Sequence, residues 1–209
     1  MGKSEQGAKQ KKGHLSHRTD FMVRTNQTFL EYIETLYEKQ QHKEEIRIKQ
    51  FTKGQNLLRQ GEAATKVMLI KEGITKCYLS EENDKEYIVE FLGTGEIVGE
   101  IESIRAITCL CSVDAITDTS VFAFSTPYFL HLLQTDLQLN HLLLNSFAGR
   151  IINTSIRASY QQLYTVEHSL KKLLELQAKY DLKLSKEEMA SYLGVTIRTL
   201  NRSLKGLLD

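Results

Sequence analysis

Short apolar runs separated by turn residues fill the middle of the chain, from Ile46 to Phe124. Turns are marked about every eight to twelve positions by glycines and by Asn83-Asp84. Many short strands at this spacing are typical of an antiparallel sandwich or roll. The runs that we expect to form strands are VMLI (67–70), TKCYL (75–79), EYIVEFL (86–92), CLCSVDAI (109–116) and SVFAF (120–124).

Helical periodicity flanks this region on both sides. Residues 26–41 carry Phe29, Ile33, Leu36 and Tyr37 at helical spacing. After the strands, Pro127 fits the first turn of a helix that runs through FLHLLQ. A long helical pattern follows from about Asp136 to Leu163, and another helix is predicted from Glu167 to Tyr180.

The long helix carries an apolar seam that is typical of a coiled coil. Its members alternate at spacings of four and three and would lie at a dimer interface: Asn140, Leu144, Phe147, Ile151, Thr154 and Ala158. Four apolar residues lie off the seam and could face the strands: Leu137, Leu142, Leu143 and Ile152. Two apolar faces favour a dimer helix, and the alternative is a single amphipathic helix packed on its own domain.

The pattern of a helix-turn-helix occupies residues 184–208. Ser185 and Glu188 form a capping box that begins one helix. Gly194 can end that helix with a positive φ, and Thr196 can cap the next. Ser203 is polar at a position that such helices often keep apolar.

The second helix of this motif leaves polar and basic side chains for DNA or solvent, and no acid occurs between Glu188 and Asp209. Arginine can bond guanine edges, asparagine suits adenine, and lysine or threonine can hold phosphates. The alternative is an ordinary helical hairpin with a solvated basic face. Arg198 and Arg202 are our leading base contacts in the predicted DNA-binding set, which is Thr196, Ile197, Arg198, Thr199, Asn201, Arg202 and Lys205.

Composition narrows the class of protein but not its partner. The chain has 209 residues and a net charge of +1, from 27 basic and 26 acidic residues, so overall charge does not indicate nucleic acid. No apolar stretch has the length of a membrane span and no secretory signal is visible, so we expect a cytoplasmic protein with no membrane partner. Residues 1–20 are polar and rich in lysine, so we expect a disordered basic leader. It is either a solvated extension or a tail that contacts DNA phosphates.

Catalytic and metal chemistry find no support in the sequence. No catalytic triad, paired-carboxylate motif, phosphate loop or dinucleotide fingerprint is present, so we expect no enzyme and no cofactor. Cys109 and Cys111 would point to the same face of a predicted strand. Two thiols are a poor metal site without further ligands, and the histidines show no metal spacing, so we predict no metal. The thiols are interpreted as small buried apolar groups, with a redox or metal pair as the alternative.

The order of β-roll, long helix and helix-turn-helix resembles the Crp/Fnr superfamily of bacterial transcription regulators over residues 46–209. Three stretches carry the resemblance: FTKGQNLLRQGEAATKVMLIKEG, FLGTGEIVGEIESI, and the terminal motif YLGVTIRTLNR. GEIESI together with the terminal motif is similar to the YeiL-like branch. The resemblance implies an α+β fold with an antiparallel, double-stranded β-helix roll of the cyclic-nucleotide-binding type, a dimerisation helix and a helix-turn-helix lacking a full wing.

The resemblance also implies where an effector would bind. Gly99-Glu100 matches the family's ribose-binding pair, and Thr154-Ser155 falls where the base-contacting pair would lie. The family's Arg-Ser phosphate pair is replaced by Cys109-Leu110, and an anionic phosphate needs a charge partner in an apolar cavity. We therefore expect an effector other than cyclic AMP, or none.

These observations predict a homodimeric DNA-binding regulator that contacts double-stranded DNA and RNA polymerase. Its expected parts are the leader (1–20), the sensor roll (21–134), the dimerisation helix (135–163) and the helix-turn-helix domain (164–209). The alternative function is a sensor or interaction module that no longer binds DNA tightly, because the family's β-hairpin wing does not follow the second helix.

Overall fold

Two β-sheets form the centre of the structure, a computed structural model that describes residues 22–40, 45–82 and 85–207. The predicted leader lies outside these residues. The strands of the five-stranded sheet run in the order β1 (Val23–Arg24), β6 (Glu86–Leu92), β5 (Thr75–Ser80), β8 (Ser112–Ala115) and β3 (Asn56–Leu58). The order in the four-stranded sheet is β2 (Ile46–Phe51), β9 (Thr119–Ser125), β4 (Lys66–Glu72) and β7 (Ile97–Val98).

Among the strands that the structure describes, all pairs are antiparallel except that of β1, which pairs in parallel with β6. The apolar runs predicted at 67–70, 75–79, 86–92 and 120–124 all lie within strands. Residues 109–111 do not, because β8 begins only at Ser112, so the predicted strand at 109–116 is too long. Strand β1 was not predicted, because its two residues are too few to show any periodicity.

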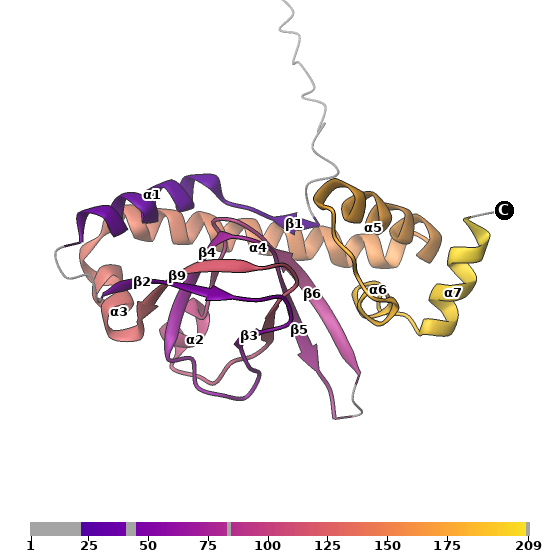
Figure 1. Cartoon of the computed structure of the whole chain (residues 1–209), viewed down its shortest axis with the longest axis horizontal. Coiled ribbons are helices and arrows are strands. Elements are labelled where there is room, and N and C mark those ends of the chain that lie inside the picture. The colour runs from indigo at the N-terminus through magenta and orange to yellow at the C-terminus, as the bar shows by residue number, and fades with distance from the viewer. Residues whose placement is uncertain (1–21, 41–44, 83–84, 208–209) are drawn as a thin grey trace, which may run out of the picture.

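Helices cover the four-stranded sheet and build one hydrophobic core with it. The helices are α1 (Gln27–Lys39), α3 (Thr126–Thr135) and the first turns of α4 (Leu137–Leu163), while the short α2 (Glu100–Arg105) follows β7. Figure 1 shows α1 and α4 running alongside each other above the strands. Phe29, Phe122 and Phe129 are each at most 1% exposed in this core, which explains the helical spacing of apolar residues in 26–41.

The long helix α4 packs on the roll with only part of the face that we expected. Leu139 and Leu143 are buried against the roll, and Leu142 is partly buried. Leu137 and Ile152 were expected to face the strands, but they are 78% and 56% exposed. The core ends at Leu143 and Phe147. The second half of the helix contacts the roll through Arg150 and Arg157, and Ile152, two residues after Arg150, lies on a different face of the helix.

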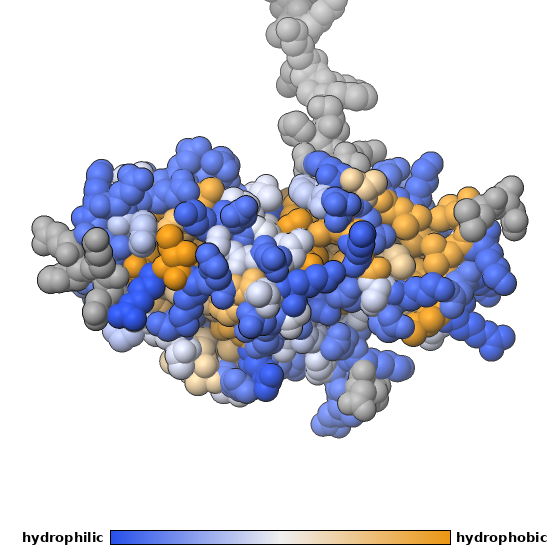
Figure 2. Space-filling view, viewed as in Figure 1, coloured by the Kyte–Doolittle hydropathy of each residue, from blue (hydrophilic) through white to orange (hydrophobic). Residues whose placement is uncertain are grey.

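The C-terminal helices pack against the edge of the five-stranded sheet. They are α5 (Val166–Tyr180), α6 (Lys186–Leu193) and α7 (Ile197–Gly206). Leu170, Leu173 and Leu200 are fully buried in a core that continues into Ile88 and Phe91 of β6. Figure 2 shows apolar residues gathered over these helices, beside the more hydrophilic surface of the roll.

Candidate functional site

The helix-turn-helix begins with the capping box that the sequence predicts. The Ser185 amide donates to the Glu188 carboxylate at 2.9 Å, and the Glu188 amide donates to the Ser185 hydroxyl at 3.1 Å. Gly194 ends α6 with φ +67°, a left-handed conformation that costs glycine little. The Thr196 side chain then accepts from the Thr199 amide at 3.2 Å and begins α7.

Ser203 has a partner that explains its polarity. It is 2% exposed on the inner face of α7, and its hydroxyl donates to the Glu167 carboxylate of α5 at 2.8 Å. Backbone hydrogen bonding in the first turn of α5, together with the Ser203 hydroxyl, lowers the pKa of Glu167. The polar residue in the motif is therefore a tie between α7 and α5.

The predicted DNA-binding residues lie on one helix at the outer end of the molecule, where α7 is farthest from the roll (Figure 1). Thr196, Ile197, Arg198, Arg202 and Lys205 are exposed, and Thr199 and Asn201 are half-buried.

Only part of this set already interacts with the rest of the chain. Thr199 shares a hydrogen bond of 3.1 Å with Thr196. The charge of Arg202 contributes to lowering the pKa of Glu167, so Arg202 lies near the start of α5. Arg198 and Lys205 form no ion pair within the described part of the chain. The accessible cations of α7 are thus available to an external anion.

The predicted dimer seam is mostly uncovered in a single chain. Leu144 and Ile151, seven residues apart, are 63% and 69% exposed, and Thr154 and Ala158 are exposed too. Asn140 is half-buried and its amide donates to the carbonyl of Leu133 at 2.7 Å.

Phe147, the remaining seam residue, packs partly against the roll core. Leu137 lies one heptad before Leu144 and is also exposed. The exposed apolar stripe of α4 is therefore Leu137, Leu144 and Ile151, at a strict spacing of seven.

Gly99 and Glu100, the pair that resembles a ribose-binding motif, form a tight turn and a buried ion pair in this structure. Gly99 has φ +83°, and a Cβ at this position would lie 2.6 Å from the carbonyl oxygen of Lys66. Glu100 is 1% exposed and is bonded to the guanidinium of Arg150 from α4. Arg150 also donates to the carbonyl of Ile97.

A largely buried network of charges surrounds this ion pair. Arg24 bonds Glu90 at 2.9 Å and Glu96 at 2.6 Å, and a nitrogen of Arg150 lies 3.8 Å from the same Glu96 oxygen. Burial raises the pKa of Glu96 and of Glu100, although the neighbouring arginines act against it. Arginines of this chain therefore satisfy the buried glutamates Glu96 and Glu100.

The other predicted effector residues are not brought together around Glu100. Cys109 is 3% exposed and its amide donates to the Glu62 carbonyl at 2.8 Å, whereas Leu110 is 61% exposed. Thr154 and Ser155 are exposed on α4, and the Ser155 hydroxyl donates to the carbonyl of Ile151.

Cys111 pairs with Cys77 of β5 rather than with Cys109. A hydrogen bond between these two thiols raises the pKa of Cys77 and lowers that of Cys111. The prediction that Cys109 and Cys111 share one face of a strand is wrong, because 109–111 lie outside β8. The sequence could not reveal the new pair, because its two members are far apart along the chain.

Sequence reasoning also missed Arg157, which joins the roll to the helix-turn-helix. One of its nitrogens, Nη2, donates to the carbonyls of Ile88 and Tyr192, at 2.7 and 2.8 Å. The Lys76–Glu188 ion pair, at 3.1 Å, is a second link between the two parts. The described residues contain no cluster of ligands suited to a metal ion, and none of their helices is both long and apolar enough to cross a membrane.

Comparison with known proteins finds a known domain in the roll. Residues 48–136 match the model of the cyclic nucleotide-binding domain. A search of curated proteins finds no match to the sequence. Solved structures are similar in fold at low identity, between 15% and 20% for the three described next.

The c-di-GMP-responsive global regulator CLP of Xanthomonas campestris superposes with a TM-score of 0.72 at 20% identity, over 84% of this chain and 90% of CLP. TTHB099, a transcriptional regulator of the CRP family from Thermus thermophilus, superposes with a TM-score of 0.66 at 15% identity, over 76% of this chain and 83% of TTHB099. FixK2 of Bradyrhizobium japonicum superposes with a TM-score of 0.61 at 20% identity, over 78% of this chain and 84% of FixK2. Residues 48–136 therefore match the cyclic nucleotide-binding domain, and 76–84% of the chain shares the roll, long helix and helix-turn-helix fold of solved Crp/Fnr-type transcriptional regulators.

Proposed function

We propose that this protein is a homodimeric transcription regulator that binds double-stranded DNA through α7, and that it works in the cytoplasm with RNA polymerase as a partner. The observation that carries the proposal is the composition of the outer face of α7. Arg198, Arg202 and Lys205 are exposed there, and no described residue of α7 is acidic. A basic recognition helix on a rigid helix-turn-helix fits the major groove.

The exposed stripe of α4 supports a dimer. Apolar side chains repeating every seven residues pack well against the same stripe of a second helix, and water is a poor environment for them. A twofold pair of α4 helices would present two copies of α7 to successive major grooves about 34 Å apart. The expected DNA site is therefore an inverted repeat.

We further propose that the effector is not a cyclic nucleotide. The Glu100 carboxylate that would meet a ribose is already bonded to Arg150, and no arginine follows at Cys109-Leu110 to hold a phosphate. Glu90 and the buried Glu96 lie in the same network and would repel an anionic phosphate. Calorimetric titration with cyclic AMP and cyclic GMP is expected to show no specific heat at micromolar concentration, and tight binding of either would contradict the proposal.

DNA selection from a random pool tests the binding function. Purified protein should enrich an inverted repeat, and Arg198→Ala should weaken binding and relax the preference at one base pair of each half-site, by about 1–3 kcal/mol. Lys53→Ala is the matched control, because Lys53 is exposed on a turn of the roll, away from α7. If wild type and Arg198→Ala prefer the same sequence, Arg198 does not contact a base.

A further inference from the structure

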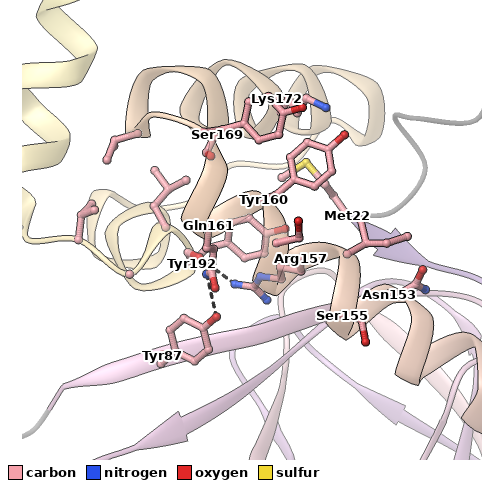
Figure 3. A pocket seen from close by; sticks show the side chains of 17 residues that line it. Met22, Tyr87, Asn153, Ser155, Arg157, Tyr160, Gln161, Ser169, Lys172 and Tyr192 are labelled. Atoms are coloured by element: carbon pink, nitrogen blue, oxygen red, sulfur yellow. Dashed lines mark hydrogen bonds between the residues drawn. The ribbon is translucent and has the colours of Figure 1, made fainter.

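A cavity of about 970 Å³ lies where α4, α5 and α6 meet the start of β6. This volume is at the upper end of the range of small-molecule sites. Aromatic rings form much of the wall, namely Tyr87, Tyr160, Tyr164 and Tyr192. Figure 3 shows Tyr87 and Tyr160 on opposite sides of Arg157, with Met22 facing the same space.

Arg157, one of two cations that line this cavity, has no anionic partner among the residues that the structure describes. Arg157 uses Nη2 to bond two backbone carbonyls, but its Nη1 is buried and has no hydrogen-bond partner. The guanidinium lies 4.2 Å from the ring centroid of Tyr192 and 5.2 Å from that of Tyr87. Arg157 is half-buried, and a partly desolvated charge without a counter-ion, together with a buried unpaired donor, is costly.

The remaining lining also favours an anion. Lys172 is the second cation and lies 4.8 Å from the ring centroid of Tyr160. None of the described residues that line the cavity is acidic. Tyr160 and Tyr164 stack at 4.6 Å, so the cavity offers flat apolar faces beside its two positive charges.

We propose that this cavity binds a small aromatic anion, a carboxylate or sulfonate on a planar ring, whose acidic group is attracted by the charges of Arg157 and Lys172 and whose ring packs among the tyrosines. The site is separate from Gly99-Glu100 in the roll. Because the cavity is lined by the long helix α4 and by Leu193-Gly194-Val195 of the helix-turn-helix turn, an occupant would contact both. Binding does not depend on the proposed DNA function, whereas a role as effector does rest on it.

Fluorescence titration with 8-anilinonaphthalene-1-sulfonate tests the site, with the neutral N-phenyl-1-naphthylamine as comparator. The full chain should bind the sulfonate saturably, at one site per chain. Arg157→Gln should weaken sulfonate binding about tenfold or more and change binding of the neutral dye much less. Arg105→Gln, which removes an exposed cation of α2, is the matched control and should bind both dyes as the wild type does.

Because Arg157 also bonds two carbonyls, a second variant leaves it intact. Ser169→Trp, from the α5 wall, should obstruct part of the cavity and reduce binding of both dyes. Equal sulfonate binding by wild type, Arg157→Gln and Ser169→Trp would overturn the proposal. If the wild-type protein binds the dye but binds no DNA, the proposed function is refuted and the proposed cavity site is not.

Discussion

Removing the exposed stripe of α4 should separate the dimer without unfolding the chain. The double variant Leu144→Ala, Ile151→Ala removes side chains that are 63% and 69% exposed in one chain and that lie outside the buried core of the roll. Complete burial of such a side chain contributes about 1.5–3 kcal/mol. About two thirds of each side chain is exposed in one chain, and alanine keeps one carbon of it. Burying the remainder in a dimer therefore corresponds to about 1 kcal/mol of association free energy for each residue.

Twofold symmetry doubles this effect, because each residue occurs once in each chain. Four truncated side chains should therefore cost about 4 kcal/mol of dimerisation free energy, which is about a thousandfold in the dissociation constant. Sedimentation equilibrium over a concentration series measures that constant directly. Ile48→Ala is the control, because Ile48 is also exposed but lies on β2 of the roll, and it should leave the constant unchanged.

An unchanged dissociation constant for the double variant would refute the coiled-coil assignment. A monomeric wild-type protein at high concentration would refute it equally. A dimer whose dissociation responds to Ile48→Ala and not to the stripe would place the interface on the roll instead.

Three further predictions concern the roll and the helix-turn-helix. Burial raises the pKa of Glu100, so the folded protein binds a proton on this carboxyl more tightly than the unfolded chain does. The resulting contribution to stability is fully present below about pH 4.3 and is lost as pH rises. Urea unfolding should therefore show wild type losing stability relative to Glu100→Gln as pH rises from about 4.5 to about 7, and the opposite trend would show that the pKa of Glu100 is not raised. Gly99→Ala should cost about 1–3 kcal/mol in the same assay, because its Cβ would meet the Lys66 carbonyl at positive φ, and a neutral effect would show that the turn adapts. Ser203→Ala should cost about 1 kcal/mol through the lost bond to Glu167, whereas increased stability would mean that an apolar residue suits the position better.

Local patterns predicted the parts of the fold that depend on neighbouring residues. The capping box at Ser185, the turn at Gly194 and the cap at Thr196 each involve groups only three or four positions apart, and the structure shows all three. The strands at 67–70 and 120–124 are marked by uninterrupted apolar runs that the roll buries on both faces.

Contacts between side chains far apart along the chain could not be predicted from the sequence. Arg150 meets Glu100 across 50 positions, and Arg157 meets the carbonyl of Ile88 across 69. Each arginine lies on a helix with ordinary polar neighbours, so periodicity does not distinguish it from a solvated residue. The face that α4 presents to the roll was predicted only in part for the same reason, since Ile152 lies beyond the end of the core that buries Leu143.

The spacing of half-sites in selected DNA tests the central claim most directly. If two copies of α7 act together through α4, sequences enriched from a random pool should contain two inverted half-sites whose centres are about 10–10.5 base pairs apart, or a multiple of that. The enrichment should disappear in the Leu144→Ala, Ile151→Ala variant, which keeps α7 intact. Enrichment of single half-sites, or of no sequence at all, by the wild-type protein would contradict the account.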